Sequence, residues 1–219
     1  MSRSRFRLMV FDLDGTLVDS KRDLAESANA VLVHYGCRIH SEEAIGRMVG
    51  DGAATLVRRA FAAAGCSQPT DALDRFLEIY NRRLLTFTRP YEGVIEALTE
   101  LAGRALLAVC TNKPLKATQT ILTGLELARY FGARVVGGDG PFPRKPNPAG
   151  LASLMGAAAV SPSSTILIGD SIIDWETAHA AAAHVCMARY GFGFEGFPSE
   201  RLTADDRGVD HPRELLATL

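Results

Sequence analysis

Three aspartates come just after apolar stretches that are typical of buried strands, and together they could hold a divalent metal ion. Asp12 ends the stretch from Arg7 to Phe11, Asp14 lies two residues further on, and Asp170 follows the stretch from Thr165 to Ile168. A carboxylate in such a position must be solvated, paired or bound to a metal. Hard oxygen ligands suit Mg2+, which proteins usually hold with a few carboxylates, waters and a substrate phosphate. The sequence therefore predicts a Mg2+ site beside a phosphate site.

A hydroxyl, an amide and two lysines occupy comparable positions elsewhere in the chain. Thr111 and Asn112 end a second apolar stretch, Lys113 follows them, and Lys145 lies in a later polar loop. Because open α/β sheets bind ligands beyond the carboxyl ends of their strands, we expect these groups near the aspartates. Each motif alone has a simpler interpretation: a turn at residues 12–15, a strand-to-helix cap at Thr111, and a surface lysine at Lys145. Their joint occurrence is what predicts phosphoryl transfer.

Hydrophobic periodicity predicts the elements that would position these groups. Continuous apolar runs predict parallel strands, whereas apolar residues that recur every three or four positions predict helices. The expected strands are Arg7–Phe11, Ala105–Cys110, Arg134–Val136, Thr165–Ile168 and Val185–Ala188, and the expected helices are Val94–Leu101, Trp175–Ala183 and two that begin near Pro114 and Pro148. Helix and strand alternate here, which indicates a parallel sheet with helices on both faces.

A segment without strand signals interrupts this pattern after the first strand. Helical periodicity covers the residues between Asp19 and Thr88, with Gly36 and Gly65 at expected helix ends and Ser41 at a cap. We therefore predict an α/β fold, with a Rossmann-like parallel sheet core and an inserted all-helical cap domain. The predicted core comprises residues 1–19 and 90–219, and the predicted cap comprises residues 20–89.

These motifs resemble those of haloacid dehalogenase superfamily phosphatases, and more narrowly those of phosphoglycolate phosphatases with a helical cap. The resemblance covers almost the whole chain. Four motifs match in order: Asp12-Leu13-Asp14-Gly15-Thr16, Thr111-Asn112, Lys145-Pro146-Asn147-Pro148, and Gly169-Asp170-Ser171 with Asp174. The stretches that favour the phosphoglycolate branch are Val49–Ala53, Val136–Asp139 and Asp210–Pro212.

The resemblance implies a role for each motif residue. Asp12 is the expected nucleophile, which forms an aspartyl-phosphate, and Asp14 is the expected general acid and then base. Mg2+ and Lys145 would supply counter-charge. The expected phosphate contacts are Gly15, Thr111, Asn112 and Lys145, the expected metal ligands are Asp12, Asp170 and the main-chain carbonyl of Asp14, and Ser171 and Asp174 are expected to orient metal-bound waters or Lys145.

The substrate depends on the cap, where the sequence is least informative. We expect hydrolysis of a small phosphorylated metabolite, with 2-phosphoglycolate as the first candidate. Arg47, Arg58 and Arg59 could bind a substrate carboxylate, although such residues more often face solvent. Alternatives are a sugar-phosphate mutase, a phosphatase of another small phosphometabolite, a haloacid dehalogenase and a non-enzymatic phosphate sensor. Asp14 and Asp170 argue against a dehalogenase, which needs no metal, and the intact motifs argue against a sensor.

Composition limits the partners of the protein. The chain has 219 residues and a formal net charge of -1, which gives no argument for a nucleic-acid or acidic-membrane partner. No early apolar run is long enough for a signal-peptide core or a membrane span. We expect a cytoplasmic monomer or small homo-oligomer. The four cysteines, which show no metal-site spacing and are expected to be free thiols, are Cys37, Cys66, Cys110 and Cys186.

Overall fold

A six-stranded parallel sheet forms the core of the fold, in a computed structural model that describes residues 5–219. Residues 1–4 of the predicted core segment lie outside this range. The strands are β1 (Leu8–Phe11), β4 (Leu106–Cys110), β5 (Val135–Val136), β6 (Thr165–Gly169), β7 (His184–Ala188) and β8 (Arg207–Val209), in the order β5-β4-β1-β6-β7-β8. The predicted α/β class is confirmed. Strand β8 was not predicted, because its three residues include an arginine and a glycine and form no apolar run.

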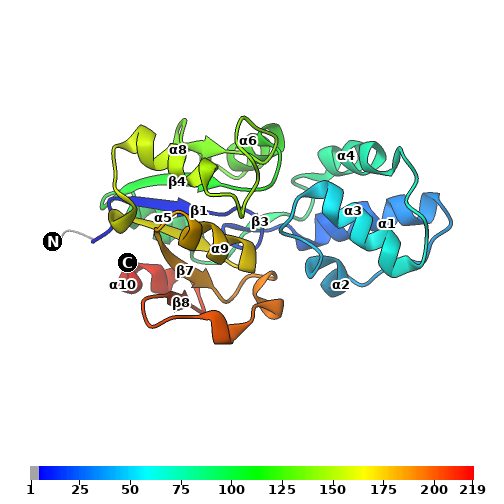
Figure 1. The fold of residues 1–219 in the computed structure, drawn as a ribbon. Helices are drawn as coiled ribbons and strands as arrows, with labels where there is room; N and C mark the ends of the chain where they lie inside the picture. Colours follow the sequence, from blue (N-terminus) through cyan, green and yellow to red (C-terminus); the bar gives the residue numbers. More distant parts are fainter. Residues whose placement is uncertain (1–4) are drawn as a thin grey trace.

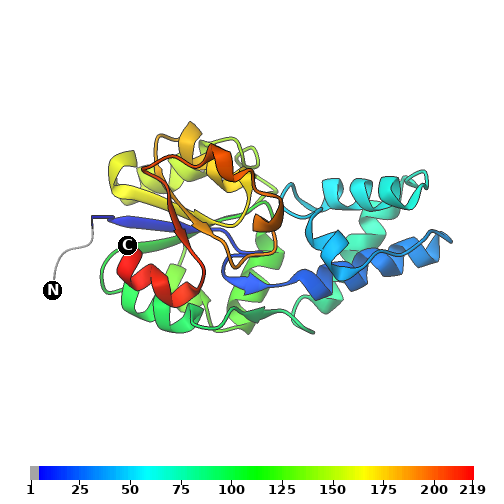
Figure 2. The ribbon, with the colours of Figure 1, turned by 90° about the horizontal axis from the view of Figure 1, so that it is seen from below.

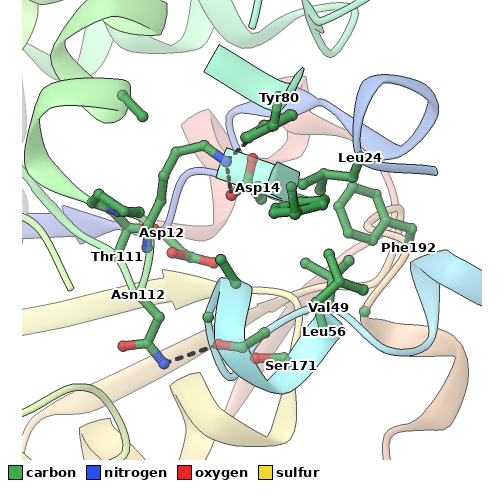
Figure 3. A pocket seen from close by; sticks show the side chains of 18 of the residues that line it. Asp12, Asp14, Leu24, Val49, Leu56, Tyr80, Thr111, Asn112, Ser171 and Phe192 are labelled. Carbon is green, nitrogen blue, oxygen red and sulfur yellow. Dashed lines mark hydrogen bonds and ion pairs between the residues drawn. The ribbon is translucent and has the colours of Figure 1, made fainter. Parts of the chain in front are cut away.

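The central strand β1 determines where the chemistry lies. All four of its residues are buried, and it pairs with β4 on one side and β6 on the other. Phe11 is level with Val109 of β4 and with Ile168 of β6. The residues that follow these three strands therefore leave the sheet at the same edge. That edge borders a pocket whose other wall comes largely from inserted helices (Figure 3).

Helices cover both faces of the sheet. Alternate residues of each strand point to opposite faces, and in β1 the side chains on both faces are apolar and buried. Met9 and Phe11 belong to the cluster that includes α5, α6, α7 and α10, whereas Leu8 and Val10 belong to the cluster that includes α8 and α9. The bounds are α5 (Val94–Leu101), α6 (Leu115–Gly124), α7 (Ala128–Phe131), α8 (Ala149–Ala158), α9 (Ile172–Ala180) and α10 (Leu215–Thr218), with 3-10 turns at Pro162–Ser164, Phe194–Gly196, Ser199–Arg201 and Pro212–Glu214. Within residues 5–219, no helix is long and apolar enough to cross a membrane.

Helix α9 begins three residues earlier than the apolar pattern predicts. Its N-cap residue is Ser171, whose main-chain N–H and hydroxyl donate to Oδ2 of Asp174 at 3.1 and 2.6 Å. These bonds cap the helix at Ser171, and such a polar capping signal is not part of the hydrophobic periodicity. The helix also ends earlier than predicted, at Ala180, and the chain leaves it through Ala182 with a left-handed φ of 53°.

Four helices inserted between β2 (Val18–Asp19) and β3 (Arg89–Pro90) form a separate group at one end of the molecule (Figure 1). They are α1 (Lys21–His34), α2 (Glu42–Gly46), α3 (Ala53–Ala64) and α4 (Ala72–Arg83). Figure 2 shows the same separation from below, with the C-terminus at the far end of the core. Residues 20–88 are all described and contain no strand, as expected. This arrangement supports our proposed division into a core and a cap of residues 20–89.

The chain crosses from the core into the cap after β2 and returns at β3, and a buried aspartate links these two crossings. Oδ2 of Asp23, on α1, accepts hydrogen bonds from the main-chain N–H of Phe87 at 2.9 Å and from the N–H and hydroxyl of Thr88, both at 2.8 Å. Beside this contact, Val18 of β2 pairs with Pro90 of β3 in an antiparallel ladder. The two crossings therefore lie side by side.

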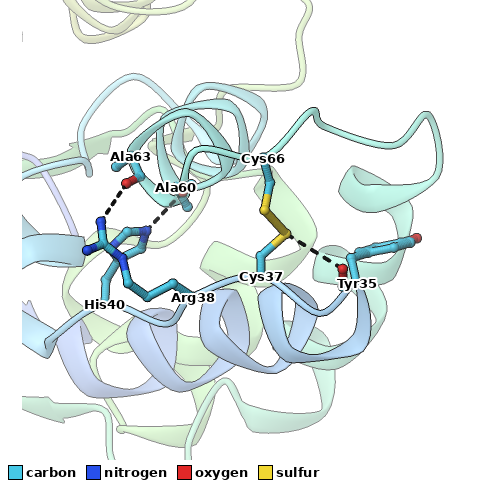
Figure 4. Close-up of a disulfide and its surroundings, with 7 residues drawn as sticks. All are labelled: Tyr35, Cys37, Arg38, His40, Ala60, Ala63 and Cys66. Carbon is cyan, nitrogen blue, oxygen red and sulfur yellow. Dashed lines mark hydrogen bonds between the residues drawn. A yellow bond between two sulfur atoms is a disulfide. The ribbon is translucent and has the colours of Figure 1, made fainter.

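The structure corrects the prediction of four free thiols. Cys37 and Cys66 form a disulfide between the ends of α1 and α3 (Figure 4). Each cysteine follows a glycine of positive φ that ends its helix, and each donates its N–H to a carbonyl five residues earlier. The two helix ends meet with a Cα–Cα distance of 6.3 Å, within the usual range for a disulfide. The other two cysteines, Cys110 and Cys186, are free and buried.

Removing this disulfide should destabilise the protein. The bond closes a loop of 29 residues, and the loss of that constraint on the unfolded chain corresponds to about 3–4 kcal/mol in the loop-closure treatment. We expect the double variant Cys37→Ser/Cys66→Ser to lose that amount in urea unfolding under non-reducing conditions. Dithiothreitol should destabilise the parent protein similarly and leave the variant unchanged. Equal free energies of unfolding for the two proteins would contradict the prediction.

Candidate active site

Lys145 joins two buried aspartates at the centre of the site. Its Nζ atom lies 2.8 Å from Oδ1 of Asp12 and 2.5 Å from Oδ1 of Asp174. Burial raises the pKa of Asp12 to about 6, and the charge of Lys145 offsets part of this effect. Burial alone would lower the pKa of Lys145, but the two carboxylates hold it above its ordinary value. Lys145 is therefore a fixed positive charge beside Asp12.

Asp170 adds a third buried carboxylate to this group. Burial, and then repulsion from Asp174 and Asp12, raises the pKa of Asp170 well above its ordinary value. Its Oδ2 atom accepts a hydrogen bond from the main-chain N–H of Gly193 at 2.7 Å. When all three carboxylates are ionised, Lys145 balances only one of the three negative charges.

This charge imbalance fits a divalent metal ion. One oxygen from each of Asp12, Asp170 and Asp174 lies within 4.8 Å of the other two. All three donors are hard carboxylate oxygens, the type that Mg2+ prefers. The sequence-predicted ligands Asp12 and Asp170 thus lie together. The structure adds Asp174 to the acidic group, in addition to its expected contact with Lys145.

Glycines allow the backbone to pack closely around Asp170. Gly15 has a φ of 85°, and a Cβ atom at this position would collide with Oδ2 of Asp170. A Cβ atom on Gly191 would collide with the same carboxylate. The N–H of Gly15 donates to the carbonyl of Val18 at 2.9 Å. Gly15 is therefore required here for backbone conformation and close packing, and its contact with phosphate stays a prediction.

The two residues of the second motif have different surroundings. The hydroxyl of Thr111 accepts a hydrogen bond from the N–H of Lys113 at 3.2 Å, which leaves its own proton for a ligand. Nδ2 of Asn112 donates to the carbonyls of Gly50 and Lys145, both at 2.9 Å. Asn112 thus ties the cap to the loop that carries Lys145. Its predicted contact with phosphate would therefore use its main-chain N–H.

Asp14 follows β1 of the core and is held through both carboxylate oxygens. The hydroxyl of Ser20 donates to Oδ1 at 2.5 Å, and Nζ of Lys113 donates to Oδ2 at 2.7 Å. Lys113 also donates to the hydroxyl of Tyr80, on α4 of the cap, at 2.8 Å. Burial alone would lower the pKa of Lys113, but Asp14 and Tyr80 hold it above its ordinary value. Lys113 is thus a charged partner of Asp14.

The cap side of the pocket is mainly apolar (Figure 3). The cap side chains that line it are Leu24, Val49, Ala53, Leu56, Phe76, Leu77, Tyr80 and Asn81. Arg47 and Arg59 form ion pairs with Glu195 and Asp51, at 3.2 and 2.7 Å, and neither they nor the exposed Arg58 line the pocket. The suggested carboxylate contact from these arginines therefore has no support in this arrangement. Lys113 is the one cationic side chain in the described lining of the pocket.

Comparison with known proteins identifies the family of this chain. The family model of haloacid dehalogenase-like hydrolases matches residues 9–188, most of the chain. The chain belongs to this family of hydrolases. It is 40% identical over 198 residues to the phosphoglycolate phosphatase of Rhodospirillum rubrum, which covers 86% of this chain and 82% of that protein. It is 35% identical to phosphoglycolate phosphatase 1 of Pseudomonas aeruginosa, covering 96% and 78% of the two chains.

Solved structures agree with this assignment. The crystal structure of a predicted phosphoglycolate phosphatase from Haemophilus somnus is similar to the structure of this chain, with a TM-score of 0.87 and 32% identity over 98% of both chains. A putative phosphoglycolate phosphatase from Lactobacillus delbrueckii shares the fold, with a TM-score of 0.86 and 24% identity. The family resemblance inferred from the four motifs is confirmed.

Sequence reasoning missed two residues of the hydrolase site and left a third undefined. The two missed residues are Ser20 and Tyr80. Ser20 directly follows β2, and Tyr80 lies on an amphipathic helix, where a tyrosine is typical of an ordinary core residue. Lys113 was expected near the aspartates, without a defined role. Its position directly after the second motif was the one available signal, but a partner 99 residues earlier in the chain could not be inferred.

Proposed function

We propose that this hydrolase is a Mg2+-dependent phosphatase that hydrolyses a small phosphate monoester through an aspartyl-phosphate at Asp12. The observation that most supports it is the Lys145 bridge between Asp12 and Asp174, with Asp170 beside it. We also propose that the protein has no nucleic-acid or membrane partner, in line with its net charge of -1. We propose further that it acts in the cytoplasm as a monomer or small homo-oligomer.

In the first half of the reaction, a carboxylate oxygen of Asp12 attacks phosphorus while the bond from phosphorus to the ester oxygen breaks. Lys145 offsets the repulsion between Asp12 and the anionic phosphoryl group. Thr111 donates its free hydroxyl proton to a phosphoryl oxygen. Bound Mg2+, held by Asp12, Asp170 and the main-chain carbonyl of Asp14, would supply further positive charge to the phosphoryl oxygens.

Asp14 handles the protons in both halves of the reaction. Asp14 enters the reaction as the protonated carboxyl and gives its proton to the leaving ester oxygen, so that an alcohol departs and Asp14 is left as the carboxylate. It then takes a proton from the water that attacks phosphorus, which releases phosphate and restores Asp12. Ser171 and Asp174 support this chemistry indirectly, because Ser171 holds Asp174 and Asp174 holds Lys145.

The first candidate substrate is 2-phosphoglycolate. Relatives at 40% and 35% identity carry the name phosphoglycolate phosphatase. The pocket is small in this closed arrangement, with a volume of about 60 Å3, which favours a small ester over a bulky one. Gly52 and Ala53 at the start of α3 also line it, and main-chain N–H groups at a helix start favour a carboxylate.

The apolar cap wall favours a second candidate, a phosphate monoester of an uncharged alcohol. In the described pocket lining, the one cationic side chain is Lys113, and Asp14 already pairs with it. A substrate carboxylate would therefore meet no free cationic side chain there. An uncharged leaving alcohol would avoid the cost of burying a second anion against Leu56 and Phe76.

A phosphate-release screen would test the function and separate the two candidates. It should compare 2-phosphoglycolate with ethyl phosphate, which has the same two-carbon skeleton without the carboxylate, and include sugar phosphates and nucleotides. We expect release that requires Mg2+ and stops with EDTA. A kcat/KM at least tenfold higher for 2-phosphoglycolate would select the first candidate, and the reverse order the second. Absence of Mg2+-dependent release from every ester would overturn the proposed phosphatase function.

Stabilisation by Mg2+ should increase with pH. The pKa of Asp12 is raised from 3.8 to about 6, so the metal-free fold favours the neutral carboxyl, and this group lowers stability as pH rises from about 4 to 6. Below pH 6, Mg2+ must displace a proton to bind, whereas above it the ionised ligand is already present. We expect the rise in Tm with excess Mg2+ to be larger at pH 7.5 than at pH 5.5. Equal increases at both pH values would contradict this coupling.

A further inference from the structure

A cap residue, a core lysine and the proposed acid-base aspartate form a continuous chain of polar contacts. The hydroxyl of Tyr80 lies 2.8 Å from Nζ of Lys113, and the same nitrogen lies 2.7 Å from Oδ2 of Asp14 (Figure 3). Nζ of Lys113 also lies 4.7 Å from the centre of the Tyr80 ring. Lys113 and Tyr80 are 7% and 4% exposed, so both contacts are shielded from solvent.

This chain crosses the boundary between the core and the cap. Lys113 follows β4 of the core, whereas Tyr80 lies on α4 of the cap. The ring and hydroxyl of Tyr80 therefore define the position of the Lys113 ammonium group only while the cap is closed over the pocket. Without Tyr80, the long lysine side chain would keep one partner, Asp14, and more rotational freedom.

Asp14 needs such positioning more than an ordinary surface carboxylate does. It must present one oxygen to the leaving group and later to water, and proton transfer requires hydrogen-bond distance. Ser20 fixes Oδ1 from the β2 side, and Lys113 fixes Oδ2 from the opposite side. Neither Ser20 nor Lys113 belongs to the group around Lys145, so this support is specific to Asp14.

We propose that Lys113 is a positioning residue for Asp14, and that Tyr80 makes this positioning depend on closure of the cap. The proposal rests on the proposed phosphatase function, in which Asp14 protonates the leaving oxygen. A lysine that served only as a buried ion pair would support the fold without affecting one leaving group more than another. Leaving-group dependence therefore distinguishes the two roles.

The test compares kcat/KM for two esters in Mg2+. An alkyl ester, 2-phosphoglycolate or ethyl phosphate, needs a proton on its leaving oxygen, whereas p-nitrophenyl phosphate releases a stable phenolate. Because kcat/KM covers the steps up to phosphoryl transfer, it reports on this proton. We expect Lys113→Met to lower kcat/KM for the alkyl ester by about 100-fold or more and for p-nitrophenyl phosphate by less than tenfold. Tyr80→Phe, which removes one oxygen, should act in the same direction by about 2- to 10-fold.

Matched controls and a double mutant make the outcome decisive. Lys116→Met alters an exposed lysine, and Tyr130→Phe removes a hydroxyl that bonds Thr99 away from the pocket, so both should keep parent activity. In an Asp14→Asn background, Lys113→Met should add little further loss for the alkyl ester.

Three results would overturn the proposal. Equal losses on both esters would show that Lys113 does not act through Asp14, and additive losses with Asp14→Asn would show the same. An unchanged ratio in Tyr80→Phe would remove the dependence on the cap. If Lys113→Met does not fold, Tyr80→Phe alone still decides between these outcomes. If the parent protein hydrolyses neither ester with Mg2+, the proposed function itself fails and this role falls with it.

Discussion

Asp12→Asn should abolish measurable turnover, with kcat lowered on the order of 10^4-fold or more. An amide has nearly the size of a carboxylate but cannot form the phosphoryl ester, so the route through a covalent intermediate is lost. The measurement is phosphate release with saturating Mg2+ and the best ester from the screen. A quench experiment with a 32P-labelled ester should trap labelled protein for the parent and none for the variant.

Loss of activity in Asp12→Asn should not reflect loss of folding. Burial raises the pKa of Asp12 to about 6, so the ionised form lowers the stability of the metal-free protein at neutral pH. The variant removes that charge and should have a Tm at least as high as the parent without metal. Asp205→Asn, at an exposed position, is the matched control and should keep full activity. Phosphate release by Asp12→Asn near the parent rate would disprove the nucleophile assignment.

Lys145→Met should reduce both activity and stability. Lys145 is 6% exposed and contacts two buried carboxylates, Asp12 and Asp174. Methionine retains much of the side-chain volume but leaves both carboxylates without their cation. Breaking a buried ion pair on one side costs about 3 kcal/mol, and loss of one stabilising charge at the phosphoryl group lowers kcat on the order of 10^3-fold.

Two measurements separate these effects of Lys145→Met. Urea unfolding without metal at pH 7.5 should show the loss of stability, and the loss should shrink at pH 5, where the carboxylates take up protons instead. Kinetics with saturating Mg2+, below the unfolding transition, should show the loss of kcat. Lys116→Met, an exposed lysine on α6, should change neither quantity. A variant with parent kcat would show that Lys145 has no part in phosphoryl transfer.

The closed cap is maintained by contacts of two kinds. Polar contacts cross the boundary at Asn112 with Gly50 and at Lys113 with Tyr80. Apolar side chains of the cap, such as Leu56 and Phe76, line the other side of the pocket. One polar contact starts from Asn112 of the second motif and the other from Lys113 directly after it, so cap closure and the arrangement of the catalytic loops are physically connected. In the proposed reaction, this closure would exclude water during transfer to Asp12.

The strand ends were predictable because their signals are local. Continuous apolar runs predicted β1, β4 and β6, and the parallel register places the residues that follow them at one sheet edge. The grouping of Asp12, Asp170 and Lys145 follows from that topology together with the motif order. Helix boundaries were less accurate where polar capping decided them, as at Ser171 before α9.

The amino-acid sequence by itself determined the fold class, the family and the residues proposed for the chemistry, because these depend on periodicity and on motifs within short stretches. Only the tertiary structure decided which distant groups meet. The disulfide between Cys37 and Cys66 depends on the packing of α1 against α3, and the contact of Tyr80 with Lys113 depends on how the cap closes on the core. Neither pairing has a local signal, because each joins side chains about 30 residues apart in the chain, on separate elements that meet only through tertiary packing.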